Sequence, residues 1–505
     1  MNFLKFLLLS LLFIGCSTTK NVVQKQKDDG SITLKFVQVN DVYEIAPLSG
    51  GKYGGMSRVA YVRDSIKAEN PNTYLFMAGD FLNPSLLGTV KLNGERIHGK
   101  QMIEVMNAMD FTLVTFGNHE FDIDEADLQK RLDESTFQWM SSNTFQKKDS
   151  VAQSFVSGRG NVAFNYTLNA VDEDGTNISI GFVGSTIPSN PKDYVFYGDI
   201  YDYSQKAYTV IKDSVDITVG LTHLEIEQDV ALANKIPELK LVMGGHEHNN
   251  MLVPTNNGVV AKADANAKTV YVHTLVYNTI TKQLNVDSQL VPIDDTTPSN
   301  PQVKAIVDKW NVILEEKIKE VIADPYEVIY RATIPLDGTD SASRGVQTNL
   351  GEIITHAMAL SFNSKVDAAI VNGGSIRIDD QLSGDVTSMD IFRVLPFGGH
   401  VLKVKISGAL LKEVLDYGKS KGGTGAYLQR YNITENETYG WNVGPMEIDT
   451  EKVYTIAMSD FLLKGFDIPF LTKDNVGILE VYEPSENEAA ADVRKAVIEY
   501  LKSIN

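Results

Sequence analysis

Short apolar runs alternate with helix-like patterns along most of the chain. An alternating or continuous β-branched apolar run predicts a strand, whereas apolar residues at three- and four-residue steps predict an amphipathic helix. In the first part of the chain these patterns predict strands at 32–39, 73–78, 112–116, 178–183, 216–220 and 240–243, helices at 58–68, 100–109 and 124–132, and added antiparallel strands at 161–168 and 269–277. Strands that alternate with helices in this way indicate a layered α/β core.

A loop-like cluster of Pro, Ser, Thr and Asn at 294–301 ends this region. One long helical pattern follows at 302–322, and Pro325 stops it. A second α/β region then begins, with predicted helices at 349–362, 408–418 and 489–504 and strands at 368–371, 401–406 and 453–458. We therefore predict two α/β domains, at 31–298 and 326–505, joined by a rigid connector helix within 299–325.

The N-terminal segment is predicted to be a targeting signal. Residues 1–16 combine Lys5 with an apolar core at 6–14 and end on Cys16, the only cysteine of the chain. The ending resembles a bacterial lipobox, which implies that Cys16 is lipidated, that the polar stretch 17–30 is a tether, and that the protein is exported and anchored to a bacterial membrane, facing the periplasm or the cell exterior. The alternative is an ordinary signal peptide with a chance cysteine.

Charge and cysteine content exclude several classes of function. The net charge of −19 opposes binding to a nucleic-acid polymer, because such binding depends on cationic side chains that displace counterions from phosphates. Positive charge for an anionic small-molecule ligand must therefore be local, from a few arginines or a metal. The single cysteine excludes intrachain disulfides and thiolate metal sites, so any metal has nitrogen and oxygen ligands.

Five predicted strands of the first region end on side chains that can bind metal. These side chains are Asp41, Asp80, Asn118 with His119, His223, and His246 with His248. Ligands collect at the carboxyl edge of open α/β sheets, so residues far apart in sequence can converge there. His, Asp and Asn together suit Mn, Zn, Fe or Co better than Ca. Two such ions can act together on a phosphoryl group, with Asp80 as the natural bridging carboxylate.

These motifs resemble a known family. The order of Asp41, GD, GNHEFD, TH and GHEH is similar to the calcineurin-like metallophosphoesterase signature. Nearly the whole chain from about Ser31 resembles the bacterial 5′-nucleotidase family, which also includes UDP-sugar hydrolases and 2′,3′-cyclic phosphodiesterases. The resemblance implies a four-layer metallophosphatase domain and a C-terminal α/β nucleotide-binding domain.

The resemblance also implies a role for each strand-end residue. It implies one metal held by Asp41, Asp80 and His248, and a second held by Asp80, Asn118, His223 and His246. His119, oriented by Asp122, is expected to stabilise transition-state charge instead of binding metal. The family usually has a histidine ligand where this chain has Tyr43. Tyr43 either binds as a phenolate, which favours Fe(III) in a mixed-valence pair, or turns away.

The second domain carries candidate substrate-binding residues. Arg344 and Arg377 offer bidentate forks for an anion, and a glycine pair after the 368–371 strand lets the backbone approach a ligand. The family resemblance extends this set to Arg344, Asn372, Gly374, Arg377, Phe397, Phe461 and Asp467, with the two phenylalanines stacking on a base and Asp467 binding ribose. Two departures from the family are Asp340, where a second arginine is usual, and Phe466, where a glycine is usual.

The leading hypothesis is an extracytoplasmic enzyme that hydrolyses nucleotides to nucleoside and phosphate. It needs two metal ions and a small-molecule phosphate ester, and a hinge near 323–326 to bring the two domains together. The departures at Asp340 and Phe466 favour a relative with another substrate, such as a UDP-sugar or a cyclic nucleotide. The substitution at Tyr43 is the one sign of a third possibility, a surface lipoprotein that binds nucleotides with degraded catalysis.

Overall fold

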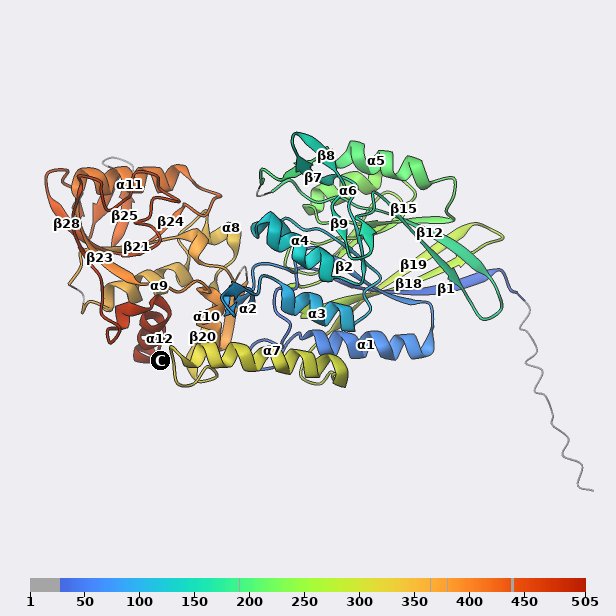
Figure 1. Ribbon diagram of the computed structural model, residues 1–505, viewed down its shortest axis with the longest axis horizontal. Coiled ribbons are helices and arrows are strands. Elements are labelled where there is room, and N and C mark those ends of the chain that lie inside the picture. The colour runs from blue at the N-terminus through green and yellow to red at the C-terminus, as the bar shows by residue number, and fades with distance from the viewer. Residues whose placement is uncertain (1–27, 190, 364, 379, 437–439) are drawn as a thin grey trace, which may run out of the picture.

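Two α/β domains lie side by side and are joined by helix α7 (Pro301–Lys319) (Figure 1). The computed structural model describes residues 28–189, 191–363, 365–378, 380–436 and 440–505. The signal segment and Cys16 lie outside this range. In the described part of the chain, no helix combines the length and apolarity that crossing a bilayer requires.

The N-terminal domain is built on two six-stranded sheets. The first has the order β19 (Gln283–Pro292), β18 (Thr269–Asn278), β1 (Ser31–Val39), β2 (Thr73–Ala78), β5 (Leu113–Thr115) and β6 (Gln138–Met140). The second has the order β11 (Tyr166–Val171), β12 (Asn177–Val183), β14 (Ile217–Leu221), β15 (Leu239–Met243), β17 (Val259–Lys262) and β16 (Met251–Pro254). From β1 to β6 and from β12 to β17 the neighbouring strands are parallel.

The two sheets face each other across an aromatic core. Phe36 of β1 lies 4.7 Å from Phe76 of β2 and 6.0 Å from Phe182 of β12, measured between ring centroids. Because side chains alternate along a strand, the neighbours Val37 and Leu75 point to the other face, into a cluster shared with the covering helices. Both faces of β1 and β2 are therefore buried.

Helices cover the outer faces of both sheets. On the first sheet lie α1 (Met56–Glu69), α3 (Lys100–Ala108) and α7, and on the second lie α5 (Ile200–Ile211) and α6 (Ile226–Lys235). The predicted four-layer arrangement of helix, sheet, sheet and helix is confirmed.

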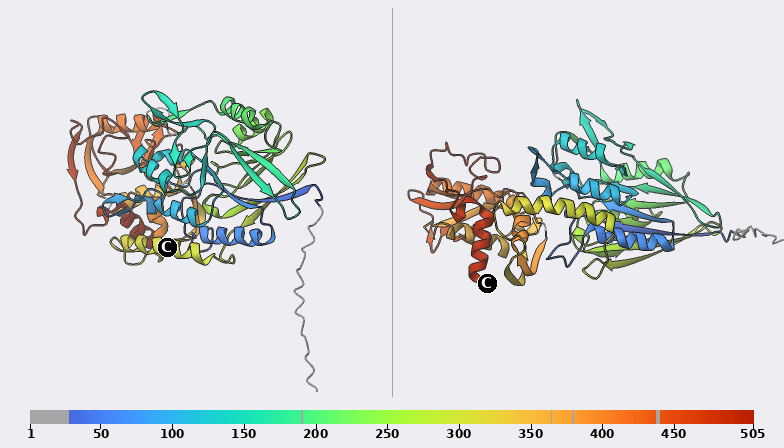
Figure 2. Two further views of the ribbon diagram at one scale, coloured as in Figure 1. Left: turned by 45° about the vertical axis from the view of Figure 1, so that its right-hand side comes forward. Right: turned by 60° about the horizontal axis from the view of Figure 1, so that its bottom comes forward.

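The C-terminal domain is a three-layer unit. Its five-stranded sheet has the order β24 (Leu428–Tyr431), β21 (Ala368–Asn372), β28 (Val453–Ser459), β23 (Val401–Ser407) and β29 (Ile478–Tyr482). Helix α11 (Gly408–Ser420) packs on one face, and α9 (Asn349–Leu360) and α12 (Val493–Ile504) pack on the other. Figure 2 shows α7 running from one domain to the other.

Three sequence predictions need correction. The strand predicted at 161–168 is interrupted and forms two strands, β10 (Gly160–Asn161) and β11. Between them, the backbone of Ala163 makes hydrogen bonds to the backbone of Trp139 and Ser141. The long helix ends at Lys319, before Pro325, and only a turn continues it. Strand β19 was not predicted, because as an edge strand it carries few buried side chains.

Candidate metal and substrate site

The strand-end side chains meet at the edge of the N-terminal domain that faces the C-terminal domain. Asp41 follows β1, Asp80 follows β2, and His223 follows β14. Oxygen and nitrogen atoms of these three buried residues all lie within 4.8 Å of one another. Asp41 and Asp80 end parallel neighbours of the first sheet. His223 ends a strand of the second sheet, so it reaches them because the two sheets pack face to face.

Two more predicted ligands adjoin this group. The Nε2 atom of His248 lies 3.6 Å from Asp41 Oδ1 and 3.0 Å from the Tyr43 hydroxyl. The same hydroxyl lies 3.4 Å from Asp80 Oδ2, and His223 Nε2 lies 3.1 Å from that oxygen. Donor atoms spaced in this way can surround one small cation.

The residues fit a metal ion. Within the described part of the chain, three buried polar atoms of this group have no hydrogen-bond partner: Asp41 Oδ1, Asn118 Oδ1 and His223 Nε2. Buried polar atoms are nearly always satisfied, and bound cations would supply the missing partners. Burial lowers the pKa of His223, but the Asp80 and Asp41 carboxylates outweigh it and raise the pKa to about 9. The site therefore attracts positive charge, and its donors are the nitrogen and oxygen atoms that Mn, Zn, Fe and Co prefer.

His246 is placed differently from the other predicted ligands. It lines a cavity of about 160 Å³ together with Asp80, Asn118 and His248. Its Nε2 atom, however, lies 3.3 Å from Glu225 Oε1, and its backbone φ is 92°. The structure thus brings His246 to the cavity without adding its Nε2 to the compact Asp41, Asp80 and His223 group.

His119 and Asp122 form an oriented pair. His119 Nδ1 lies 2.7 Å from Asp122 Oδ2, which fixes the ring and leaves the other nitrogen for the cavity that His119 lines. Burial lowers the pKa of His119, but Asp122 and Asp80 outweigh it and raise the pKa to about 10. The same Asp122 oxygen accepts a hydrogen bond from Arg377 of the second domain at 2.9 Å.

Glu120 is a site residue to which sequence reasoning assigned no role. Its fully buried carboxylate accepts hydrogen bonds from four backbone N–H groups, those of Gly117, Asp80, Phe81 and Leu82. Burial and the Asp80 carboxylate raise its pKa to about 7, although the backbone donors act in the opposite direction. Glu120 therefore ties the loop after β2 to the loop after β5. The one sequence feature that could have pointed to Glu120 was its place in the GNHEFD motif.

Two glycines are required by close approach. A Cβ atom on Gly117 would lie 2.0 Å from Asp80 Oδ1, and one on Gly245 would lie 2.2 Å from the Ala78 carbonyl oxygen. Both distances are far below van der Waals contact, so the strand-end loops can meet only because these positions lack side chains.

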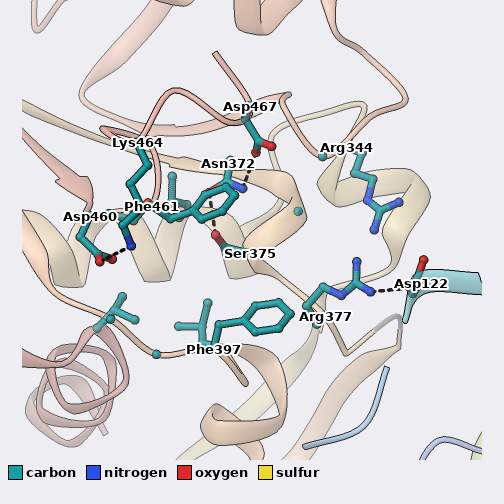
Figure 3. A pocket seen from close by; sticks show the side chains of 18 of the residues that line it. Asp122, Arg344, Asn372, Ser375, Arg377, Phe397, Asp460, Phe461, Lys464 and Asp467 are labelled. Atoms are coloured by element: carbon teal, nitrogen blue, oxygen red, sulfur yellow. Dashed lines mark hydrogen bonds and ion pairs between the residues drawn. The ribbon is translucent and has the colours of Figure 1, made fainter. Parts of the chain in front are cut away.

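All seven predicted substrate residues line one cavity of about 620 Å³ (Figure 3). They are Arg344, Asn372, Gly374, Arg377, Phe397, Phe461 and Asp467. Arg344 lines both this cavity and the 160 Å³ cavity beside the predicted metal ligands. The two cavities therefore lie on either side of Arg344.

Three polar residues of the larger cavity, Asn372, Asp467 and Arg344, are already paired. Asn372 donates to Asp467 at 2.8 Å, and burial raises the pKa of Asp467. Arg344 lies 2.6 Å from Asp340, the residue that departs from the family pattern. The second departure, Phe466, is 73% exposed, and its ring lies 5.8 Å from that of Phe461. Asp340 therefore lines the smaller cavity and offsets the charge of Arg344, whereas Phe466 lies beside a ring of the larger cavity.

Replacing Glu120 tests its bracing role. In Glu120→Gln one oxygen becomes an amide NH₂ that faces two backbone donors, so we expect a loss of about 2 kcal/mol or more in the free energy of unfolding. Chemical denaturation of the metal-free protein measures it. The control Glu69→Gln alters an exposed carboxylate on α1. Equal stability of the two variants would contradict the assignment.

Two different family models match the two domains of the chain. Residues 34–250 match the calcineurin-like phosphoesterase family, and residues 328–473 match the 5′-nucleotidase C-terminal domain. A solved 5′-nucleotidase precursor from Thermus thermophilus has a similar fold, with a TM-score of 0.65 at 21% identity, covering 94% of this chain and 97% of that one.

Curated relatives carry both halves in the same order. The chain is 26% identical to the trifunctional nucleotide phosphoesterase YfkN of Bacillus subtilis over 80% of its length, but spans only 30% of that protein. It is 26% identical to the 5′-nucleotidase of Bos taurus over 83% of its length and spans 79% of that protein. The chain therefore carries a calcineurin-like phosphoesterase domain followed by a 5′-nucleotidase C-terminal domain.

Proposed function

We propose that the chain is a metal-dependent phosphoric ester hydrolase that releases phosphate and nucleoside from nucleotides. One observation carries the proposal: Arg344 lines both the cavity of predicted substrate residues and the cavity of predicted metal ligands. A nucleotide has the matching form, with a flat base at one end and an anionic phosphate at the other. The names of the relatives from Bacillus subtilis and Bos taurus agree with this substrate class.

Two metal ions are part of the proposal. One would be held by Asp41, Asp80 and His248, with Tyr43 as a candidate fourth ligand, and the other by Asp80, Asn118, His223 and His246. Mn, Zn, Fe and Co suit these donors. When bound, such ions supply Lewis acidity and lower the pKa of water at the site.

Other residues of the chain would stabilise charge on the phosphoryl group and bind the base. His119, held by Asp122, faces the cavity with a pKa raised by neighbouring carboxylates, which suits stabilisation of charge on the phosphoryl group or protonation of the leaving oxygen. Phe397 and Phe461 lie on the walls of the larger cavity, where a base can stack between them (Figure 3). Arg377 contributes a guanidinium from the second domain.

A second substrate class has specific support. Asp340 places a carboxylate on the wall of the metal-side cavity and offsets the charge of Arg344. This arrangement favours a substrate with less negative charge at the reacting phosphorus than a monoester dianion carries. A cyclic nucleotide or a UDP-sugar, in both of which the reacting phosphate carries two substituents, is therefore the alternative substrate.

We also propose that the enzyme is exported and anchored to a bacterial membrane through lipid on Cys16. The support is the apolar segment that ends on the only cysteine, followed by a polar stretch. The catalytic domains would then face the periplasm or the cell exterior, where nucleotides are available for salvage.

Phosphate release from a substrate panel tests the proposed activity. The panel contains nucleoside mono-, di- and triphosphates, cyclic nucleotides and UDP-sugars, with metal-free protein restored by Mn, Zn, Fe or Co. We expect metal-dependent release, and a loss of about 10²- to 10⁴-fold in kcat for His119→Asn with unchanged metal content. His98→Asn is the matched control, because His98 forms a similar, partly buried pair with Asp127 at 2.5 Å and lines neither cavity.

Two results would contradict the proposal. Protein that retains no metal and releases no phosphate from any substrate would indicate a binding protein with degraded catalysis. An equal loss of kcat in His98→Asn and His119→Asn would remove the special role of His119.

The role of Tyr43 is tested by metal affinity. Because its hydroxyl lies close to both His248 and Asp80, we expect Tyr43→Phe to weaken binding of one ion by about 10-fold or more, and Tyr43→His to restore it. Equilibrium dialysis with metal analysis measures both. Tyr53→Phe, at an exposed position nearby, is the control. Unchanged affinity in Tyr43→Phe would show that the phenol turns away from the metal.

A further inference from the structure

We propose that the segment from Lys262 to Asn266 is a brace that fixes the metal-bearing loops relative to one another, with Lys262 and Asn266 as positioning residues. This inference rests on the proposed metal site. The segment begins at the end of β17 and runs into a 3₁₀ turn at Ala265–Ala267. None of its residues was singled out by sequence motifs, and none is a predicted ligand.

Lys262 connects the two histidine-bearing loops. Its side chain is fully buried, and its Nζ atom donates to the Leu224 carbonyl oxygen at 2.6 Å, next to His223. The same Nζ forms an ion pair with Glu247, the residue between His246 and His248. One ammonium group therefore holds the loop after β14 and the loop after β15 together.

Two carboxylates complete this connection. Asp229, on α6, lies 2.9 Å from Lys262 Nζ and accepts a hydrogen bond from the Thr222 hydroxyl at 2.6 Å. The other oxygen of Glu247 accepts from the Ile226 backbone N–H at 2.6 Å. Each carboxylate thus links Lys262 to a residue close to His223 in sequence.

The cost of burying these charges points to a positional role. Apolar side chains of similar size usually stabilise a core as well as or better than a buried ion pair. Lys262 and Asp229 are nevertheless both fully buried, in a layer otherwise packed with aliphatic side chains such as Val242 and Val260. Ion pairs and hydrogen bonds specify direction and distance, which aliphatic contacts do not, and a metal site needs both.

Asn266 extends the brace to the loop after β1. Its side-chain oxygen accepts from the backbone N–H groups of Tyr43 at 3.1 Å and Glu44 at 3.3 Å, and its own N–H donates to the Asp41 carbonyl at 2.8 Å. Its φ of 57° lies in the left-handed region, which asparagine tolerates better than most residues. Asn266 therefore fixes both ends of the turn that carries Asp41 and Tyr43.

Backbone N–H groups of the brace also bond to the loops after β1 and β15. Ala263 N–H donates to the Asn40 side chain at 2.7 Å, and Asn40 in turn donates to Asp41 Oδ2 at 2.7 Å. Ala265 N–H donates to the His248 carbonyl at 3.0 Å. In five consecutive residues the brace touches the loops after β1, β14 and β15, so the ligand positions of all three depend on it.

A measurement of metal binding distinguishes a positioning role of the brace from a general contribution to stability. Metal-free full-length protein is titrated with Co²⁺, and bound metal and the visible Co²⁺ spectrum are recorded. We expect two equivalents in the wild type, and affinity lowered by about 10- to 100-fold with an altered spectrum in Glu247→Gln, Lys262→Met and Asn266→Ala. Glu247→Gln keeps the shape of the side chain and serves if Lys262→Met does not fold.

The control is Glu134→Gln on α4 (Glu125–Glu134). It removes a carboxylate that lies 2.9 Å from the buried Arg131, away from the predicted ligands. We expect wild-type affinity and spectrum from it. Folded variants of the brace that bind Co²⁺ like the wild type would overturn the inference alone, whereas a wild type that binds no metal would overturn the proposed function and this inference with it.

Discussion

The buried Asp80 carboxylate connects the loops that carry the predicted metal ligands. One of its oxygens accepts the His119 backbone N–H at 2.8 Å, and the other lies 3.1 Å from His223 Nε2. A buried carboxylate among other acids is unfavourable without compensating positive charge. Glu120, beside it, adds a second buried acid and holds the Asp80 backbone in place. The surrounding loops are therefore arranged for a cation and are costly without one.

Two ion pairs connect the second domain to the N-terminal domain. Arg377 reaches across to Asp122 at 2.9 Å, so the residue that orients His119 is also a point of contact between domains. Lys268, just past the brace, pairs with Asp380 of the second domain. The Arg377–Asp122 contact lines the cavity that we assign to the base. Substrate binding and the relative position of the domains are consequently linked through a small number of ion pairs.

Local motifs predicted much of this site. The strand-end positions of Asp41, Asp80, Asn118 and His223 follow from short apolar runs that stop at polar residues. Parallel pairing brings the first three together, and the packing of the two sheets adds His223. The connector helix and the layered fold were predicted for the same reason, since apolar spacing is a local property.

What the sequence did not reveal depends on partners distant in the chain. Glu120 bonds to a loop about forty positions earlier, and Asn266 bonds to Tyr43 more than two hundred positions away. Lys262 lies in a segment that reads as an ordinary strand end, and nothing nearby shows that its charge is buried and paired. The side-chain direction of His246, toward Glu225, is likewise set by tertiary contacts.

We propose that these loops would hold two metal ions, with Asp80 as a ligand of both. Anomalous diffraction at the Mn absorption edge, from crystals of the full-length protein grown with Mn²⁺, can locate the ions. We expect two anomalous peaks about 3.5–4 Å apart, both next to the Asp80 carboxylate, one toward Asp41 and the other toward Asn118. A single peak, or peaks away from Asp80, would contradict it.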